Sequence, residues 1–259
     1  MTPWRTAIID ADATHIRVRG YDVTDLMRQA GFVDTVFLLH RSRLPTAGEK
    51  RVLDAVLVAV ADHGPGAPSC AAARLAASGN RQSISAAIAA GVLAIGDEHG
   101  GAGEACMTLI ASSLAGTAPD DSAIDAAAAR AFARARETGT RIPGLGHRVH
   151  TVDPRVSVLF ALAAESGVAG AGIRFVRALE ATAGAAGKAL PISIDGALAA
   201  VLHDMEFTPP AGKFIFIIGR VAGLTAEVAE EHLREKAMRI RIPVEYDGEA
   251  PRALPRSKE

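Results

Sequence analysis

The chain has 259 residues, of which 49% are hydrophobic but only 4% are aromatic, so its core must be built largely from alanine, valine, leucine and isoleucine. The formal net charge of −1 gives no reason to expect nucleic acid or an anionic membrane as a partner. The two cysteines, Cys70 and Cys106, are too few for a disulfide scaffold. They indicate buried free thiols in a reducing compartment.

The sequence shows no targeting or membrane-spanning segment. Met1 to His15 contains three charged residues and no continuous apolar run, so a secretory signal is not expected. The most apolar run, Phe214 to Ile218, is far shorter than the ~20 residues that a spanning helix needs. We therefore expect a cytoplasmic protein.

In chain order, two short strands are expected at Trp4 to Asp10 and His15 to Arg19, followed by helices that dominate the rest. The spacing of apolar residues and the capping signals predict helices that begin near Asp22, at Thr46, at Ser83 (running to Glu98), after Asp120, at Pro154, at Ile173 and at Phe214 (running to Met238). A strand is the alternative for Phe214 to Ile218. The tail from Glu249 is rich in proline and charge and is expected to be frayed.

The clearest chemical signal is a glycine-rich loop with the sequence Pro143-Gly144-Leu145-Gly146-His147, followed by Asp153-Pro154-Arg155. Glycines permit tight turns and close approach to a ligand, and Asp-Pro is typical of a helix start. A histidine exchanges protons near neutral pH, and an arginine binds a carboxylate through two hydrogen bonds. The alternative is a histidine in a purely structural turn.

Four more polar residues lie at breaks between apolar helices or inside one: His63, His99, Asp195 and Arg220. His63 could simply complement a helix C-terminus, and Asp195 could be only a helix N-cap. Arg220 needs a partner because it interrupts an apolar segment. Glu98-His99 does not form a zinc-binding helix motif, since no second histidine follows at the required spacing.

Together these segments resemble the citrate synthase superfamily, and the resemblance extends over nearly the whole chain. The matching blocks, in chain order, are Arg19-Gly20-Tyr21-Asp22-Val23, Asp62-His63-Gly64, His99-Gly100-Gly101-Ala102-Gly103-Glu104, Gly144-Leu145-Gly146-His147-Arg148-Val149, Asp153-Pro154-Arg155, Ile194-Asp195-Gly196 and Gly219-Arg220-Val221-Ala222-Gly223.

The resemblance implies an all-α, mainly helical fold with a short N-terminal β segment, in a homodimer or higher homo-oligomer. Each chain would have a large lobe at residues 1–102 and 201–248 and a small lobe at residues 103–200, followed by a flexible tail at 249–259. The small lobe would contain the glycine-rich loop and close over the substrates.

The resemblance also implies carbon–carbon bond chemistry between acetyl-CoA and a 2-oxo acid such as oxaloacetate. Asp195 would be the base at the thioester methyl, and His99 would donate a hydrogen bond to the enol or enolate oxygen. His147 would donate to the oxaloacetate carbonyl as it becomes the citryl hydroxyl. Neither a metal nor a permanently bound cofactor is expected, and the coenzyme A thioester is a substrate.

The binding residues follow from the same resemblance. The dicarboxylate would contact His63, Arg155 and Arg220, and CoA would contact Pro143, Gly144, Leu145, Gly146 and Lys188. An arginine before a C-terminal proline reaches the partner's site in the family. Here isoleucine directly precedes Pro243, so Arg241, or failing that Arg239, is the candidate.

Two departures from ordinary citrate synthases favour the citryl-CoA lyase branch. The chain is shorter, and Gly196 follows the aspartate where synthases usually have a bulkier residue, as in the lyase module of ATP-citrate lyase. We therefore expect cleavage of (S)-citryl-CoA to acetyl-CoA and oxaloacetate. The alternatives are a citrate or 2-methylcitrate synthase and a non-catalytic citrate- or CoA-binding subunit, and the retention of His99, His147 and Asp195 argues against the last.

Overall fold

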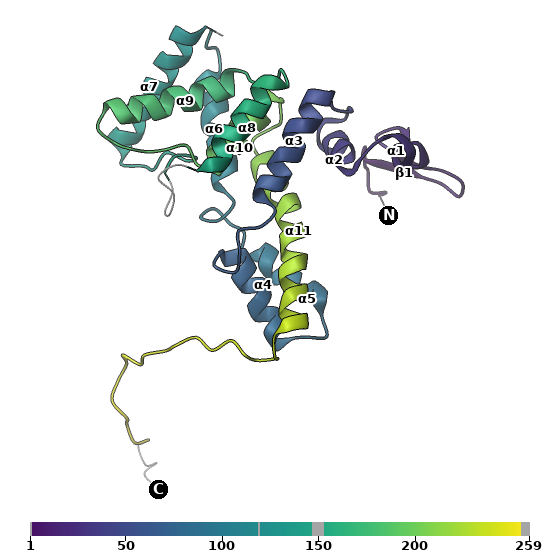
Figure 1. Cartoon of the computed structure of the whole chain (residues 1–259), viewed down its shortest axis with the longest axis vertical. Helices are drawn as coiled ribbons and strands as arrows, with labels where there is room; N and C mark the ends of the chain where they lie inside the picture. Colours follow the sequence, from purple (N-terminus) through teal and green to yellow (C-terminus); the bar gives the residue numbers. More distant parts are fainter. Residues whose placement is uncertain (1, 119, 147–152, 255–259) are drawn as a thin grey trace.

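A computed structural model describes residues 2–118, 120–146 and 153–254. Within these ranges the fold consists of eleven helices and one three-stranded sheet, which confirms the predicted mainly helical fold with a short N-terminal β segment. The long helix α11, Ala211–Arg234, runs through the molecule, as Figure 1 shows. One end of it reaches the group formed by α6 to α10, and the other lies beside α4 and α5.

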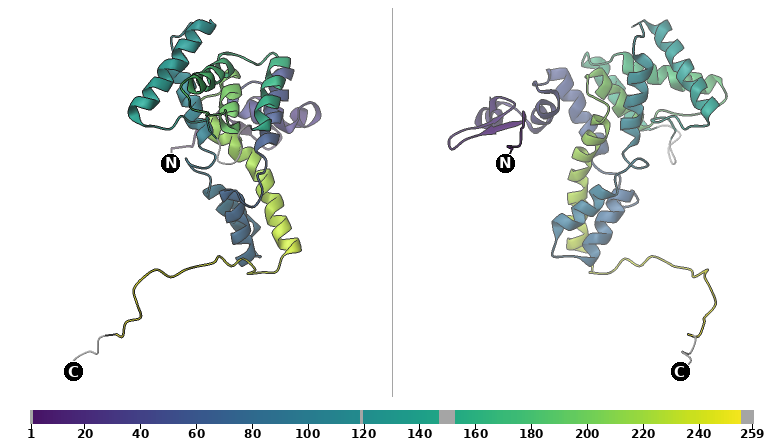
Figure 2. Two further views of the ribbon diagram at one scale, coloured as in Figure 1. Left: turned by 60° about the vertical axis from the view of Figure 1, so that its left-hand side comes forward. Right: turned by 180° about the vertical axis from the view of Figure 1, so that it is seen from behind.

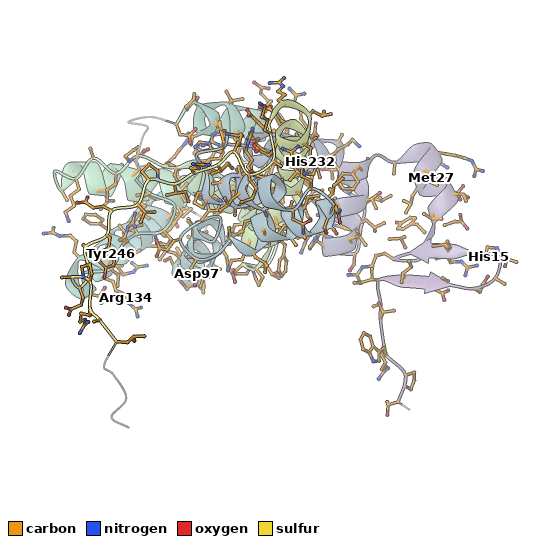
Figure 3. The ribbon with its side chains drawn as sticks, turned by 90° about the horizontal axis from the view of Figure 1, so that it is seen from below. His15, Met27, Asp97, Arg134, His232 and Tyr246 are labelled. Atoms are coloured by element: carbon orange, nitrogen blue, oxygen red, sulfur yellow. The ribbon has the colours of Figure 1, made fainter. Side chains whose placement is uncertain are left out.

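The sheet lies at the N-terminus, and its strands are shorter than predicted. Its antiparallel strands are β1, Ile9–Ala11, β2, Ile16–Val18, and β3, Tyr21–Asp22. Only the C-terminal end of the first expected strand pairs with β2. Strand β3 was not predicted. The sheet and α1 project from the rest of the chain, and His15 and Met27 lie on this projection in Figure 3.

Most helices begin where the capping residues place them. The remaining bounds are α1, Val23–Gln29; α2, Phe32–Arg41; α3, Ala47–Val60; α4, Pro68–Gly79; α5, Ile84–Leu93; α6, Ala102–Leu114; α7, Asp121–Thr138; α8, Pro154–Glu165; α9, Ala171–Ala185; and α10, Ile194–Asp204. For example, Thr46 and Glu49 form a capping box at the start of α3, and Gly139 ends α7 in the left-handed conformation.

Two predicted helix ends are wrong. The helix from Ser83 stops at Leu93 rather than Glu98, because the following residues turn back and Gly96 pairs with His99 through two backbone hydrogen bonds. Helix α11 stops at Arg234 rather than Met238. The backbone N–H of Met238 instead donates to the Ser78 carbonyl at 3.0 Å, which ties the chain after α11 to α4.

Phe214 to Ile218 is helical, so the strand alternative is wrong. Helix α11 follows Pro210 and buries Ile215, Phe216 and Gly219 on one face, which is helical rather than alternating spacing. Its glycines Gly219 and Gly223 face the end of α3. A Cβ on Gly223 would overlap the Ala61 carbonyl oxygen, so the two backbones touch there.

The main core is formed by residues of α2, α3 and α6 to α11, and a smaller cluster joins α4, α5 and α11. Cys70 and Cys106 are buried free thiols, as predicted. Burial, with a contribution from Asp195, raises the pKa of Cys106 to about 12, so this thiol stays neutral. None of the helices within the described ranges is both long and apolar enough to cross a membrane.

The molecule has an elongated outline. Figure 2 shows that the N-terminal sheet, the α4–α5 pair and the segment after α11 extend from the α6–α10 group in different directions. The proposed division into lobes at residues 103 and 200 stays a prediction, which X-ray scattering with and without bound ligands would test. Helices α3 and α8 pack across that boundary.

Candidate active site

A cavity of about 1110 Å³ lies where the ends of several helices meet. Ten of the predicted site residues line it: His63, His99, Pro143, Gly144, Leu145, Gly146, Arg155, Lys188, Asp195 and Arg220. Along the sequence they extend from His63 to Arg220. The fold therefore brings into one place nearly all the residues that the resemblance selected.

Arg220 is held at the C-terminal end of α3. Its Nε donates to the Val60 carbonyl oxygen at 3.0 Å and its Nη1 to Ser69 Oγ at 3.0 Å. The side chain is buried, and its guanidinium carbon lies 4.9 Å from the centre of the Phe216 ring. The close approach of α11 to α3 at Gly219 and Gly223 makes this contact with Val60 possible. Arg220 thus has its partner, as a buried charge requires.

Arg155 reaches the same end of α3 from α8. Its Nη1 donates to the Ala59 carbonyl oxygen at 3.0 Å, and its Nε and Nη2 donate to the two carboxylate oxygens of Asp153 at 2.9 and 2.7 Å. Asp153 is buried and also caps α8 through the Arg155 backbone N–H. These three side-chain bonds leave two of the five N–H groups of the guanidinium for another acceptor.

The two arginines also bear on the alternative reading of His63. They donate to the last two carbonyl oxygens of α3. His63 lies three residues beyond the end of that helix, is exposed, and lines the cavity. Its position fits a ligand contact better than a helix cap.

His99 is oriented by Ser69. The Ser69 Oγ accepts from Arg220 and lies 2.9 Å from His99 Nε2, and the Ser69 backbone N–H lies 3.4 Å from the same nitrogen. Since a backbone N–H can only donate, Nε2 is the acceptor and the ring proton is assigned to Nδ1. Burial, followed by the nearby charges of Arg220 and His63, lowers the pKa of His99 below its ordinary value of 6.5. The imidazole is therefore neutral at pH 7.

Asp195 is the second residue of α10, and the N-cap is Ser193, whose Oγ accepts from the Gly196 backbone N–H at 3.4 Å. The alternative reading of Asp195 as an N-cap is therefore wrong. A carboxylate in the first helical turn is favoured by the partial positive charge of the helix N-terminus. The side chain is half-buried and lines the cavity, so it is accessible to a ligand.

The structure shows what Gly196 contacts. A Cβ on Gly196 would overlap the Gly144 carbonyl oxygen. The backbone of the glycine-rich loop therefore lies directly against α10 beside Asp195.

Two predicted residues are not placed in the cavity. His147 lies outside the described residues, although Gly146 directly before it lines the cavity. Arg241 is exposed, lies beyond α11 and does not line the cavity of its own chain. Arg239 bonds Glu231 in α11 instead, its Nε lying 3.0 Å from a carboxylate oxygen.

Sequence reasoning missed several residues of this site. Asp153 lay inside a matching segment and Ser69 lay five residues after one, but neither had a role assigned. The signal for both was a polar residue next to a proline at a helix start. Arg136 and Arg141 line the cavity near the loop. The described lining residues include five lysines and arginines but only three acidic residues, which suits an anionic ligand.

Comparisons with known proteins identify the family of the chain. The family described as citrate synthase, C-terminal domain, matches residues 46–241. Citryl-CoA lyase from Hydrogenobacter thermophilus is 37% identical, with 97% of each chain covered and a TM-score of 0.90. A search of curated proteins finds no match.

More distant structures share the fold. ATP citrate lyase from Methanothrix soehngenii, in complex with citrate and coenzyme A, is 19% identical, with 95% of this chain and 42% of that chain covered and a TM-score of 0.78. Citrate synthase from Thermotoga maritima is 17% identical, with 97% of this chain and 95% of that chain covered and a TM-score of 0.59. The family match over most of the chain and the 37% identity over nearly all of it establish that this protein belongs to the citrate synthase family.

Proposed function

We propose that the protein is a citryl-CoA lyase, which cleaves (S)-citryl-CoA to acetyl-CoA and oxaloacetate. The observation that carries the proposal is the meeting of Asp195, His99 and the glycine-rich loop in one cavity with two anchored arginines. The chain has this arrangement and is 37% identical over nearly its full length to a protein described as a citryl-CoA lyase.

The proposed reaction breaks the bond between the thioester methylene carbon and the carbon that bears the citryl hydroxyl. The electron pair moves onto the thioester oxygen, where the Nδ1–H of His99 donates a hydrogen bond to the enol or enolate. Such a fixed donor is often the largest catalytic contribution. The neutral state of His99 suits donation rather than full proton transfer.

Proton transfers complete the step. The citryl hydroxyl loses its proton to a base near His147 and becomes the carbonyl of oxaloacetate. Asp195, which enters this step as the carboxylic acid, transfers its proton to the enol carbon to form the methyl group and is left as the carboxylate. In the synthetic direction Asp195 removes that proton. His147 keeps the role implied by the family resemblance as a prediction.

We assign binding of the dicarboxylate to His63, Arg155 and Arg220. Arg155 has two N–H groups left for a carboxylate, and bidentate binding is the favoured geometry between these groups. Coenzyme A would lie along the loop from Pro143 to Gly146, with Lys188 nearby and its thioester as substrate rather than as a resident cofactor.

Supplying synthetic citryl-CoA tests this function directly. Oxaloacetate is followed with malate dehydrogenase while free CoA is measured with a thiol reagent. We expect oxaloacetate and acetyl-CoA with little free CoA. If citrate and free CoA dominate, and oxaloacetate plus acetyl-CoA are also converted quickly to citrate, the protein is a synthase. Binding of citrate and CoA by calorimetry without either reaction would indicate a non-catalytic subunit.

We also propose that the chain forms a homodimer through α5. This helix is apolar on nearly all sides, which is typical of a helix that is buried all round. Yet Ile84 and Leu93 at its two ends are 57% and 85% exposed, although α4 and α11 pack against the helix. A second copy of the chain would cover the rest.

In that dimer we place Arg241 at the partner's dicarboxylate. Mixing Arg241→Ala with Asp195→Asn chains should therefore restore some activity through heterodimers with one intact site.

Replacing Leu93 by Glu should convert the dimer to a monomer, because a charge buried in an apolar interface is strongly unfavourable. Light scattering measures the mass of each variant. The control is Val158→Glu, which places the same charge on an exposed position of α8 and should leave the mass unchanged. A Leu93→Glu protein with the mass of the unmodified protein would exclude α5 from the interface.

A further inference from the structure

Three backbone segments that lead to the proposed catalytic residues meet at Gly144. Gly144 has a φ of +81°, and a Cβ there would lie 2.7 Å from the Cys106 Sγ and 2.7 Å from the Gly196 Cα. Cys106 is on α6, which begins just after His99, and Gly196 is on α10 next to Asp195. Two glycines therefore allow the loop to lie directly on both helices.

Hydrogen bonds fix this contact. The Gly144 carbonyl oxygen accepts from the Ser193 backbone N–H at 2.9 Å and from the Ser193 Oγ at 3.0 Å. The Gly146 N–H donates to the Pro191 carbonyl oxygen at 2.7 Å. Ser193 is buried, and the same hydroxyl caps α10. One side chain thus links the loop to the helix that bears Asp195.

We propose that Ser193 and Gly196 are positioning residues, which set the distance between the glycine-rich loop and the Asp195 carboxylate for the carbon–carbon bond step. This inference rests on the proposed lyase function. In it, Gly196 acts by admitting the loop backbone next to α10.

The arrangement separates positioning from dicarboxylate binding. Arg155 and Arg220 are anchored to the carbonyl oxygens of Ala59 and Val60 at the end of α3. The hydrogen bonds of Gly144 described above go to Ser193 instead of α3. A shift of the loop relative to α10 should therefore lower kcat and leave oxaloacetate binding unchanged. A shift of about 1 Å in reacting groups can cost on the order of 10²-fold in rate.

The decisive variants are at Ser193. Ser193→Ala removes the hydroxyl bond to the Gly144 oxygen and the cap of α10, while the backbone bond to Gly144 remains. Ser193→Asp keeps the cap but has no side-chain proton to donate to the Gly144 oxygen, and Ser193→Thr keeps both hydroxyl bonds. We expect kcat for citryl-CoA cleavage to fall by roughly 10- to 100-fold in the alanine and aspartate variants. The threonine variant should retain most of the activity, and the oxaloacetate Kd measured by calorimetry should stay the same throughout.

Gly196→Ala tests the backbone contact, with Gly184→Ala as its matched control. Both glycines are helical, but a Cβ at Gly184 meets nothing within 4 Å. Gly196→Ala should lower kcat at least as much as Ser193→Ala, whereas Gly184→Ala should leave it unchanged. If Gly196→Ala does not fold, the Ser193 series decides the question.

Hydrogen exchange gives a readout that does not depend on activity. The amides of residues 144–146 should exchange faster in Ser193→Ala and Ser193→Asp, while those of α3 keep their protection. The two proposals can fail separately. If the unmodified protein does not cleave citryl-CoA but residues 144–146 still exchange faster in the two variants, the positioning role is supported and the proposed function is refuted. Unchanged exchange and unchanged kcat in both variants, or a weakened oxaloacetate Kd with unchanged kcat, would overturn the positioning role.

Discussion

Replacing Asp195 by asparagine should lower turnover of citryl-CoA by roughly 10²- to 10⁴-fold, the usual contribution of a positioned general acid or base. Asparagine has nearly the shape of aspartate and remains compatible with the first turn of α10, where Ser193 supplies the cap. It cannot, however, transfer a proton to or from the carbon next to the thioester group. The measurement is kcat from the coupled oxaloacetate assay.

Binding separates a chemical defect from a folding defect. The oxaloacetate Kd of Asp195→Asn should remain near that of the unmodified protein, because the dicarboxylate is assigned to His63, Arg155 and Arg220. The control is Asp121→Asn, which changes an exposed carboxylate in the first turn of α7 and should not affect kcat. Near-normal turnover by Asp195→Asn would remove this residue from the mechanism.

Much of the fold could be predicted from local signals. Thr46 with Glu49, Asp120 and Gly139 are strong capping residues, and each lies at the helix end that it indicates. The ends that were wrong depend on tertiary contacts. The chain leaves α5 after Leu93 because Gly96 pairs with His99, and it leaves α11 after Arg234 to reach the Ser78 carbonyl oxygen. Periodicity carries no information about such partners.

The residues of the site also fall into those that sequence signals identify and those that depend on distant contacts. Its charged and histidine residues could be chosen from sequence because they stand at breaks in apolar segments and match a family pattern. The residues that orient them could not. Ser69 acts on His99 across 30 residues, and Ser193 acts on Gly144 across 49. The contact made by Gly196 could not be predicted for the same reason, since its neighbour is a backbone oxygen from a distant loop.

Replacing Arg220 by glutamine should have the second large effect, and on binding more than on chemistry. Removing one partner of a buried, hydrogen-bonded charge pair costs about 2–5 kcal/mol, which corresponds to a rise of roughly 30- to 5,000-fold in the oxaloacetate Kd. Calorimetry measures the Kd directly. Arg51→Gln, an exposed position on α3, is the matched control and should bind normally.

Arg220 also supports His99 through Ser69, so its replacement should lower kcat in addition. Ser69 Oγ accepts from Arg220 and donates to His99 Nε2, which fixes the His99 proton on Nδ1. Without Arg220 the hydroxyl is free to rotate, and the nearby positive charge that helps to keep His99 neutral is lost. Ser69→Ala should therefore lower kcat while changing the oxaloacetate Kd much less than Arg220→Gln does.

A double-mutant cycle tests whether the two residues act together. If they do, the kcat effect of Arg220→Gln combined with Ser69→Ala should be smaller than the product of the single effects, because both changes remove the same orientation of His99. Independent, multiplicative effects on kcat would mean that Arg220 influences only the dicarboxylate. An unchanged oxaloacetate Kd in Arg220→Gln, in protein that is folded at the assay temperature, would instead reduce Arg220 to a structural cap of α3, whose last carbonyl oxygen it binds.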